Sequence, residues 1–206
     1  MKFRVIPDGK PMAVDRIRAV AAKAKVVLPE PYVSFVATVG SGVPMPDYLP
    51  YHQSGEARYI QFTRIINATG AISLRRELVR ESSLDSNFIP IGINPDSDYL
   101  LLSQADGSAW LWINLGGDFP DAVERGRVIQ VAESLQGALD RFTIPAPALP
   151  WAEHIYAHDT EGLARWLDAG GDPNNTTDEA VSPVTLAQRF GHADMVELVG
   201  RHGAKG

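Results

Sequence analysis

The sequence predicts an α+β fold followed by an all-helical C-terminal region. The first observation is the order of the expected elements, because two amphipathic helices precede a strand-rich stretch and one more helix follows it. The second is a hairpin signal within residues 88–117, FIPIGINPDSDYLLLSQADGSAWLWINLGG. The third is a proline-rich segment at residues 144–150, after which the chain changes to helix and turn. Helices and strands in separate runs are typical of α+β proteins.

Two helices are expected at the start of the chain. The first spans about Val14–Lys25, where apolar residues recur at i, i+3, i+4 and i+7. The second follows Pro31, because proline suits the first turn of a helix, and it ends at Gly40. The two apolar faces consist of Ile17, Val20, Ala21 and Ala24 in the first helix and of Tyr32, Phe35, Val36 and Val39 in the second.

The stretch between these helices and the hairpin has weaker periodicity. Gly40–Pro50 is expected to be a loop. Arg58–Ile66 alternates loosely between polar and apolar residues, which predicts a strand. Residues from Ile72 to Val79 predict a short helix or an irregular amphipathic stretch.

The hairpin signal comes from two β-rich runs, Tyr99–Ser103 and Ser108–Asn114, joined by a turn at Asp106 and Gly107 that tolerates positive φ. Both faces of the second run are apolar. Because side chains alternate along a strand, one face consists of Ala109, Leu111 and Ile113 and the other of Trp110 and Trp112. The strand is therefore either covered on both sides, with residues 151–206 as one candidate cover, or it offers two tryptophans to a partner.

A short strand and a helix are expected to complete the first domain. Arg127–Val131 predicts the strand, and Ser134 is placed to cap a helix that runs to Phe142. The following sequence, IPAPALP at residues 144–150, has three prolines, which disfavour both helix and sheet hydrogen bonding. We expect a domain boundary there, with one domain at residues 1–145 and a second at residues 146–206.

A 33-residue period appears in the second domain. It relates Gly170 to Gly203 and Leu163 to Val196. The segment Ser182–Ala187 is similar to the Thr-Pro-Leu-His-Leu-Ala turn of ankyrin repeats, and Gly191-His192 stands where that family begins its second helix. The region thus resembles about two ankyrin-like repeats. Because two repeats bury little surface, we expect them to dock on the first domain.

Composition and charge exclude several classes of protein. The chain is 45% hydrophobic and 21% charged and has no run of 18 apolar residues, which predicts a soluble, cytoplasmic protein without a membrane segment. It has no cysteine, so disulfides, thiolate catalysis and cysteine-ligated metals are excluded. The net charge of −6 disfavours direct binding of nucleic acid. The basic cluster of Arg75, Arg76 and Arg80 is expected to be a solvated helix face.

No motif in the chain carries a complete chemistry. His154 and His158 are four residues apart, which suits a metal on a helix, but the sequence offers no evident third ligand. Asn94–Asp98 alternates oxygens as a calcium loop does, yet it lacks the glycine and the closing glutamate of that motif. Gly40-Ser41-Gly42 follows a helix and lacks the strand context of a nucleophile elbow. We therefore expect no catalytic residue, no metal and no cofactor, and a protein that is not an enzyme.

The first domain resembles the SUKH superfamily of Smi and Knr type. The resemblance depends on the order of the elements and on three segments: Leu28–Tyr32 with Phe35, Ile89–Gly92, and Asp98–Tyr99 through Asp106-Gly107 to Trp110. They match the opening Leu-Pro and helix, the central strand and the hairpin of that family. The resemblance implies a curved antiparallel sheet with helices on one side, which acts by binding another protein.

In bacteria the partner that the resemblance implies is a polymorphic toxin, often a basic nuclease domain, and the acidic balance of this chain suits such a partner. An intracellular regulatory or scaffolding adaptor is the alternative, and a hydrolase with an unrecognised site is a third. Contacts with the partner are expected on the Asp47–Tyr51 loop and on the Asp118–Glu124 segment. The expected contact residues are Asp47, Tyr48, Tyr51, Asp118, Asp121 and Glu124.

Overall fold

The computed structural model describes residues 3–143, 149–176 and 181–204. The chain divides into two compact units, Lys2–Thr143 and Ile144–Gly206. Most of the predicted proline-rich boundary, residues 144–148, lies outside the described residues.

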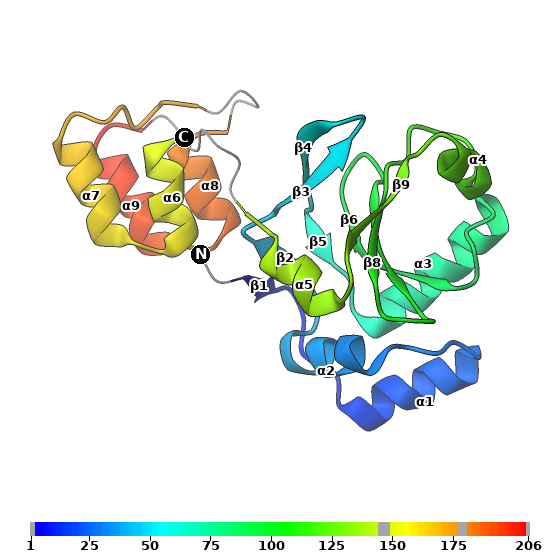
Figure 1. The fold of residues 1–206 in the computed structure, drawn as a ribbon. Coiled ribbons are helices and arrows are strands. Elements are labelled where there is room, and N and C mark those ends of the chain that lie inside the picture. Colours follow the sequence, from blue (N-terminus) through cyan, green and yellow to red (C-terminus); the bar gives the residue numbers. More distant parts are fainter. Residues whose placement is uncertain (1–2, 144–148, 177–180, 205–206) are drawn as a thin grey trace. The chain divides into compact units, whose positions relative to one another are not determined.

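A seven-stranded antiparallel sheet forms the centre of the first unit (Figure 1). Its spatial order is β1-β2-β5-β6-β7-β8-β9, so β6 is the middle strand, as the family resemblance predicts for Ile89–Gly92. A separate two-stranded hairpin, β3–β4, leaves the sheet between β2 and β5. The strands are β1 (Arg4–Pro7), β2 (Gly42–Met45), β3 (Tyr48–Gln53), β4 (Glu56–Gln61), β5 (Arg64–Ile65), β6 (Phe88–Ile93), β7 (Tyr99–Ser103), β8 (Ala109–Trp112) and β9 (Val128–Ala132).

Helices α1, α2, α3 and α5 of this unit lie where helices were expected, whereas α4 was not predicted, and α3 and α5 have side-chain caps. The Asn67 side chain accepts a hydrogen bond from the Gly70 backbone at the start of α3, and Ser134 does the same for Gly137 at the start of α5, as predicted for Ser134. Gly40 ends α2 with φ of 75°. The helices are α1 (Val14–Ala24), α2 (Glu30–Val39), α3 (Ala68–Glu81), α4 (Phe119–Glu124) and α5 (Leu135–Asp140).

Two hydrophobic cores lie on opposite faces of the sheet. The larger core packs the Leu100, Leu102 and Leu111 side chains of the sheet against α1, α2, α5 and the first half of α3. The smaller core packs Trp112 and Leu101 against α4 and the end of α3. This confirms that the two faces of β8 are both apolar and both covered. It also corrects the expectation of helices on one side only, because α4 covers the second face.

The cover over Trp112 comes from its own unit. Its ring contacts the Phe119 ring at a centroid distance of 5.2 Å and an interplanar angle of 89°, and the Tyr99 ring at 5.1 Å. Trp110 is half-buried, lies edge-on to the Phe88 ring at 5.8 Å and donates from Nε1 to Ser108 Oγ over 2.8 Å. The burial of Trp112 therefore requires no cover from residues 151–206.

The expectation of a loop at Gly40–Pro50 is wrong. β2 and the start of β3 lie there, and β2 pairs with β1 in a register that aligns Val43 with Ile6. A side chain at position 42 would collide with the Ile6 carbonyl, so Gly42 permits this close approach. The pairing joins segments far apart in the sequence, and β2 contains a proline, so local pattern could not predict it.

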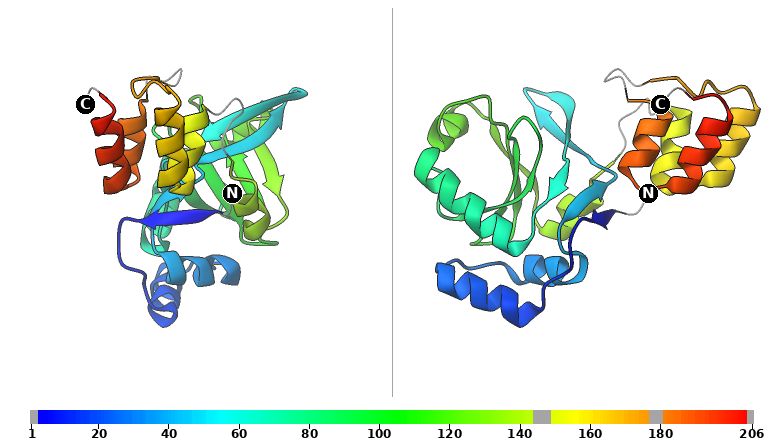
Figure 2. Two further views of the ribbon diagram at one scale, coloured as in Figure 1. Left: turned by 90° about the vertical axis from the view of Figure 1, so that its left-hand side faces the viewer. Right: turned by 180° about the vertical axis from the view of Figure 1, so that it is seen from behind.

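In residues 149–176 and 181–204, the second unit forms two helix pairs (Figure 2). They are α6 (Pro150–Ala157) with α7 (Thr160–Asp168) and α8 (Pro183–Arg189) with α9 (Ala193–Arg201). The 33-residue spacing relates Pro150 to Pro183 at the start of α6 and α8. It also relates Gly170 to Gly203, which have the same φ of 91°. The two pairs thus share a proline in the first turn of the first helix and a glycine of positive φ after the second helix.

Candidate functional site

The strand directions bring three connections to one end of the sheet. Every neighbouring pair in the main sheet is antiparallel. The strands β2, β6 and β8 therefore run in the same direction, and their C-terminal ends lie at the same end of the sheet. The β3–β4 hairpin follows β2, the Asn94–Asp98 loop follows β6, and the segment Ile113–Arg127 with α4 follows β8. We call the surface formed by these three connections the sheet-end surface. Its hairpin and α4 lie in the upper part of Figure 1. Both segments predicted to contact a partner belong to it.

The β3–β4 hairpin has one buried and one outward face. Its register pairs Leu49 with Ile60 and Tyr51 with Arg58, and Leu49, Tyr51 and Ile60 all belong to the larger core. Pro50 pairs with Tyr59 on the other face. Two predicted contact residues are therefore separated, since Tyr51 is buried while Tyr48, three positions earlier, lies on the outward face.

Tyr59 is an outward aromatic side chain that sequence reasoning did not find. It is 45% exposed and lies on the same face as Tyr48. The alternation in residues 58–66 was visible in the sequence, but the face that Tyr59 occupies depends on its pairing with β3.

Asp47 forms hydrogen bonds at the base of the β3–β4 hairpin. Its carboxylate accepts a hydrogen bond from Gln61 Nε2 over 2.6 Å, and its carbonyl oxygen accepts from the Phe62 backbone over 2.7 Å. The side chain is buried. This geometry fixes where the hairpin leaves the sheet, so any contribution of Asp47 to binding would act through the hairpin that it holds.

The Asn94–Asp98 loop is joined to the end of β8. Asp98 Oδ1 accepts from the Asn114 backbone over 2.8 Å, and Asp98 Oδ2 accepts from Asn94 Nδ2 over 2.9 Å. Asn94 and Asp98 are buried, and their side-chain oxygens accept hydrogen bonds from other groups of the chain. Asp96 remains exposed at the tip of the loop.

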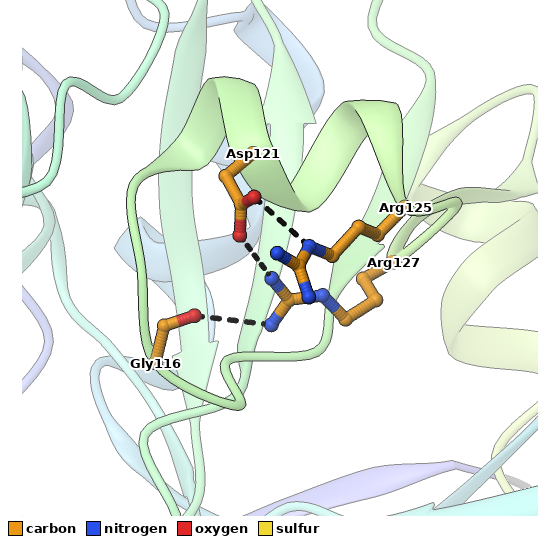
Figure 3. A network of polar contacts seen from close by, with 4 residues as sticks. All are labelled: Gly116, Asp121, Arg125 and Arg127. Atoms are coloured by element: carbon orange, nitrogen blue, oxygen red, sulfur yellow. Dashed lines mark hydrogen bonds and ion pairs between the residues drawn. The ribbon is translucent and has the colours of Figure 1, made fainter.

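The third connection is held by a network that we call the arginine clamp, which consists of Gly116, Asp121, Arg125 and Arg127 (Figure 3). The nearly buried Arg127 donates from Nη1 to the Gly116 carbonyl oxygen over 3.2 Å and from Nη2 to Asp121 Oδ2 over 2.8 Å. Arg125 Nε donates to Asp121 Oδ1 over 2.9 Å. Both oxygens of Asp121 are thus occupied, and its charge is compensated within the chain.

Unpaired negative charge remains on the sheet-end surface. Asp96, Asp118 and Glu124 are exposed and form no ion pair with any residue that the structure describes. The arginines of these three connections are all paired: besides Arg125 and Arg127 of the clamp, Arg58 pairs with Glu56 at 3.1 Å. Of the predicted acidic residues, Asp118 and Glu124 therefore present free carboxylates, whereas Asp121 does not.

Apolar side chains accompany these charges. Within the described ranges, five large hydrophobic side chains are exposed, and three of them, Tyr59, Leu115 and Val123, belong to this surface. Exposed apolar and acidic groups on one edge are typical of a protein interface rather than of a reaction centre.

Beside the sheet-end surface, burial raises the pKa of Tyr99, whose ring packs against Trp112. Two further groups with shifted pKa values lie elsewhere. Hydrogen bonds from Ser108 lower the pKa of Asp106 to about 2, in the turn between β7 and β8 at the opposite end of the sheet. Burial raises the pKa of Tyr32, whose hydroxyl donates to the Ile66 carbonyl oxygen in the core over 2.7 Å. Both are explained by the fold.

The two histidines weighed as a metal pair bind different carboxylates. His154 Nδ1 lies 3.0 Å from Asp159 Oδ2, and His158 Nε2 lies 3.0 Å from Asp194 Oδ1. Among the residues that the structure describes, no three histidine, cysteine, aspartate or glutamate side chains group as metal ligands. In the same residues, no helix is both long and apolar enough to cross a membrane.

Comparison with known proteins gives one result for the first unit. The family model described as SMI1 / KNR4 family (SUKH-1) matches residues 11–141, which is more than half of the chain. No curated protein matches the chain.

Proposed function

Because the chain belongs to the SMI1/KNR4 family (SUKH-1), which includes immunity proteins, we propose that it is a bacterial immunity protein without enzymatic activity. It binds a cognate polymorphic toxin and neutralises it by covering the active site or by locking the conformation of the toxin. The sheet-end surface is the contact face.

The observation that carries the proposal is the charge of that surface. Asp96, Asp118 and Glu124 are exposed and unpaired with any described residue, whereas the arginines of the same three connections are paired. Such a face attracts a basic partner and accelerates encounter. A nuclease toxin domain that binds phosphates is basic for its own function, so an acidic face opposite its active site would compete with its substrate.

We also propose that the second unit is a pair of ankyrin-like repeats that packs on the first unit. The 33-residue spacing of Pro150 with Pro183 and of Gly170 with Gly203 supports the repeat assignment. A pair of repeats has little interior of its own, which supports packing on a neighbour.

The test is coexpression of this chain with the effector domain encoded beside its gene. The expected result is survival of cells that the effector otherwise kills, together with a complex that copurifies. Survival without a complex would contradict neutralisation by binding.

A regulatory or scaffolding adaptor remains the second candidate, because helical repeats commonly form binding surfaces in such proteins. A gene neighbourhood without an effector gene would favour the adaptor. In that case the same surface would bind an enzyme of the host cell.

A further inference from the structure

We infer that Leu115 is the apolar anchor of the interface, and that it inserts into an apolar pocket ringed by basic side chains on the partner protein. This inference deepens the proposed function and depends on it. The occupant of the surface is a basic protein domain, and the residue that contributes most to affinity is Leu115 rather than any of the charges.

Exposure alone would not single out this residue, since solitary exposed leucines are common on protein surfaces. Leu115 is 78% exposed, the highest value among the exposed large hydrophobic side chains of the described residues. Val123, on the same connection, is 51% exposed. What distinguishes Leu115 is how its backbone is held.

The chain is fixed on both sides of Leu115. The preceding residue, Asn114, donates from its backbone to Asp98 Oδ1 over 2.8 Å. The following residue, Gly116, accepts from Arg127 Nη1 over 3.2 Å. Asp98 and Arg127 are both buried, so the side chains that form these two bonds are themselves held in place (Figure 3 shows the second bond).

Helix α4 completes the support. Phe119 and Ala122 are buried in the smaller core, and the Phe119 backbone donates to the Ser82 carbonyl oxygen over 2.8 Å. The segment between Asn114 and Phe119 is therefore short and attached at each end. A segment held in this way loses little backbone freedom on binding, which increases affinity.

The surroundings of Leu115 match the anatomy of an interface. Protein interfaces have an apolar core and a polar, solvent-accessible rim. Asp118 and Glu124 supply the charged rim on the same connection, and Val123 extends the apolar area. A partner that fits these groups has an apolar pocket with lysine or arginine at its edge.

The chain offers a matched control for the anchor. Val27 is 69% exposed, but its backbone donates to Gln104 Oε1 over 3.1 Å. Gln104 follows β7, which terminates at the end of the sheet opposite the sheet-end surface. Leu115→Ser and Val27→Ser therefore each remove one exposed apolar side chain, at opposite ends of the same unit.

The chain also offers a matched control for the charges. Glu133 is exposed and follows β9, which also ends at the opposite edge. The double variant Asp118→Asn with Glu124→Gln removes the acidic rim, whereas Glu133→Gln removes an exposed carboxylate at a distance from it.

The experiment measures binding of the full chain and its variants to the catalytically inactivated effector domain encoded beside the gene. Leu115→Ser is expected to weaken binding by about thirtyfold or more, mainly through faster dissociation. Val27→Ser should bind as the unaltered chain does. The rim variant should associate about tenfold more slowly at low salt, with little change in dissociation, and Glu133→Gln should not.

The outcomes separate this inference from the proposed function. If the unaltered chain binds and Leu115→Ser binds equally well, the anchor is wrong and the proposed function stands. If the unaltered chain does not bind, both are overturned. Because Leu115 is exposed, its serine variant should unfold at the same denaturant concentration as the unaltered chain, so a loss of binding will not reflect misfolding.

Discussion

The imidazole rings of His158 and His192 stack face to face, with their centroids 3.9 Å apart and their planes 9° from parallel. His158 follows α6 and His192 precedes α9, so the stack joins the first helix pair to the second. Asp194 reinforces the junction, because it accepts from Thr160 Oγ1 over 2.7 Å and binds His158 Nε2 at 3.0 Å. One carboxylate of the second pair thus contacts two residues of the first.

Asp194→Asn should weaken this junction in a pH-dependent manner. The Thr160 hydroxyl, and then His158, lower the pKa of Asp194 to about 2. A carboxylate with a lowered pKa contributes stability above its unfolded pKa of about 4, and the contribution disappears as the pH falls through about 2. The variant should therefore lose about 0.5 kcal/mol at pH 7, the size typical of exposed pairs, and nothing near pH 2.

The measurement is urea unfolding of the full chain between pH 2 and pH 7, followed by circular dichroism. Glu161→Gln is the control, since its 3.8 Å pair with Arg165 lies within one helix and is largely exposed. An equal loss in both variants, or a loss for Asp194→Asn that persists at pH 2, would contradict the role given to Asp194.

Gly117→Ala should destabilise the first unit more than Gly116→Ala. Both glycines have positive φ, 88° and 83°, so alanine at either position costs about 1 kcal/mol. A Cβ at position 117 would lie 2.8 Å from Asp121 Oδ2, whereas a Cβ at position 116 meets no atom within 4 Å. The difference in free energy of unfolding between the two variants reports the rigidity of the arginine clamp. Equal free energies of unfolding for the two variants would show that the Asp121 side chain moves aside without cost.

Trp112→Ala should cost about 3–5 kcal/mol of unfolding free energy, because a fully buried aromatic ring leaves a cavity. Its Nε1 finds no hydrogen-bond partner among the described residues, so the loss is one of packing. Trp110→Ala should cost clearly less, since Trp110 is only half-buried. Urea denaturation of both variants checks the order, and a larger loss at position 110 would contradict the assignment of Trp112 to the smaller core.

A fragment of residues 146–206 should fail to unfold cooperatively on its own, because two repeats bury too little apolar surface. The measurement is thermal denaturation followed by circular dichroism, with the full chain as the control. A cooperative transition in the fragment would show that the second unit is independent and would remove the reason to expect docking.

Local signals in the sequence predicted much of the fold. The helices at Val14–Ala24 and Glu30–Val39 were found from apolar spacing and from Pro31 and Gly40, and the β7–β8 hairpin from its Asp-Gly turn. Each of these depends on residues close together in the chain. β2 was missed because its partner is β1, some 38 residues earlier, and nothing local indicates that pairing.

The candidate site was predicted only in part, for the same reason. Asp118 and Glu124 were identified from their local cluster, and they are exposed. Tyr48 and Tyr51 lie on opposite faces because the segment is a strand, whereas the sequence analysis expected a loop. Arg127 was expected only to begin a strand and not to belong to the site, because its partners Gly116 and Asp121 become its neighbours only in the folded chain.

The contact residues of the sheet-end surface can be substituted without changing the hydrophobic cores of the first unit. Exposed residues of the three connections, such as Tyr59, Asp96 and Leu115, lie outside both cores, so their replacement leaves the packing around Trp112 and Leu100 intact. A lineage that meets a new partner could thus acquire a new contact surface by substitution in loops alone. The geometry separates the evolution of recognition from the evolution of stability.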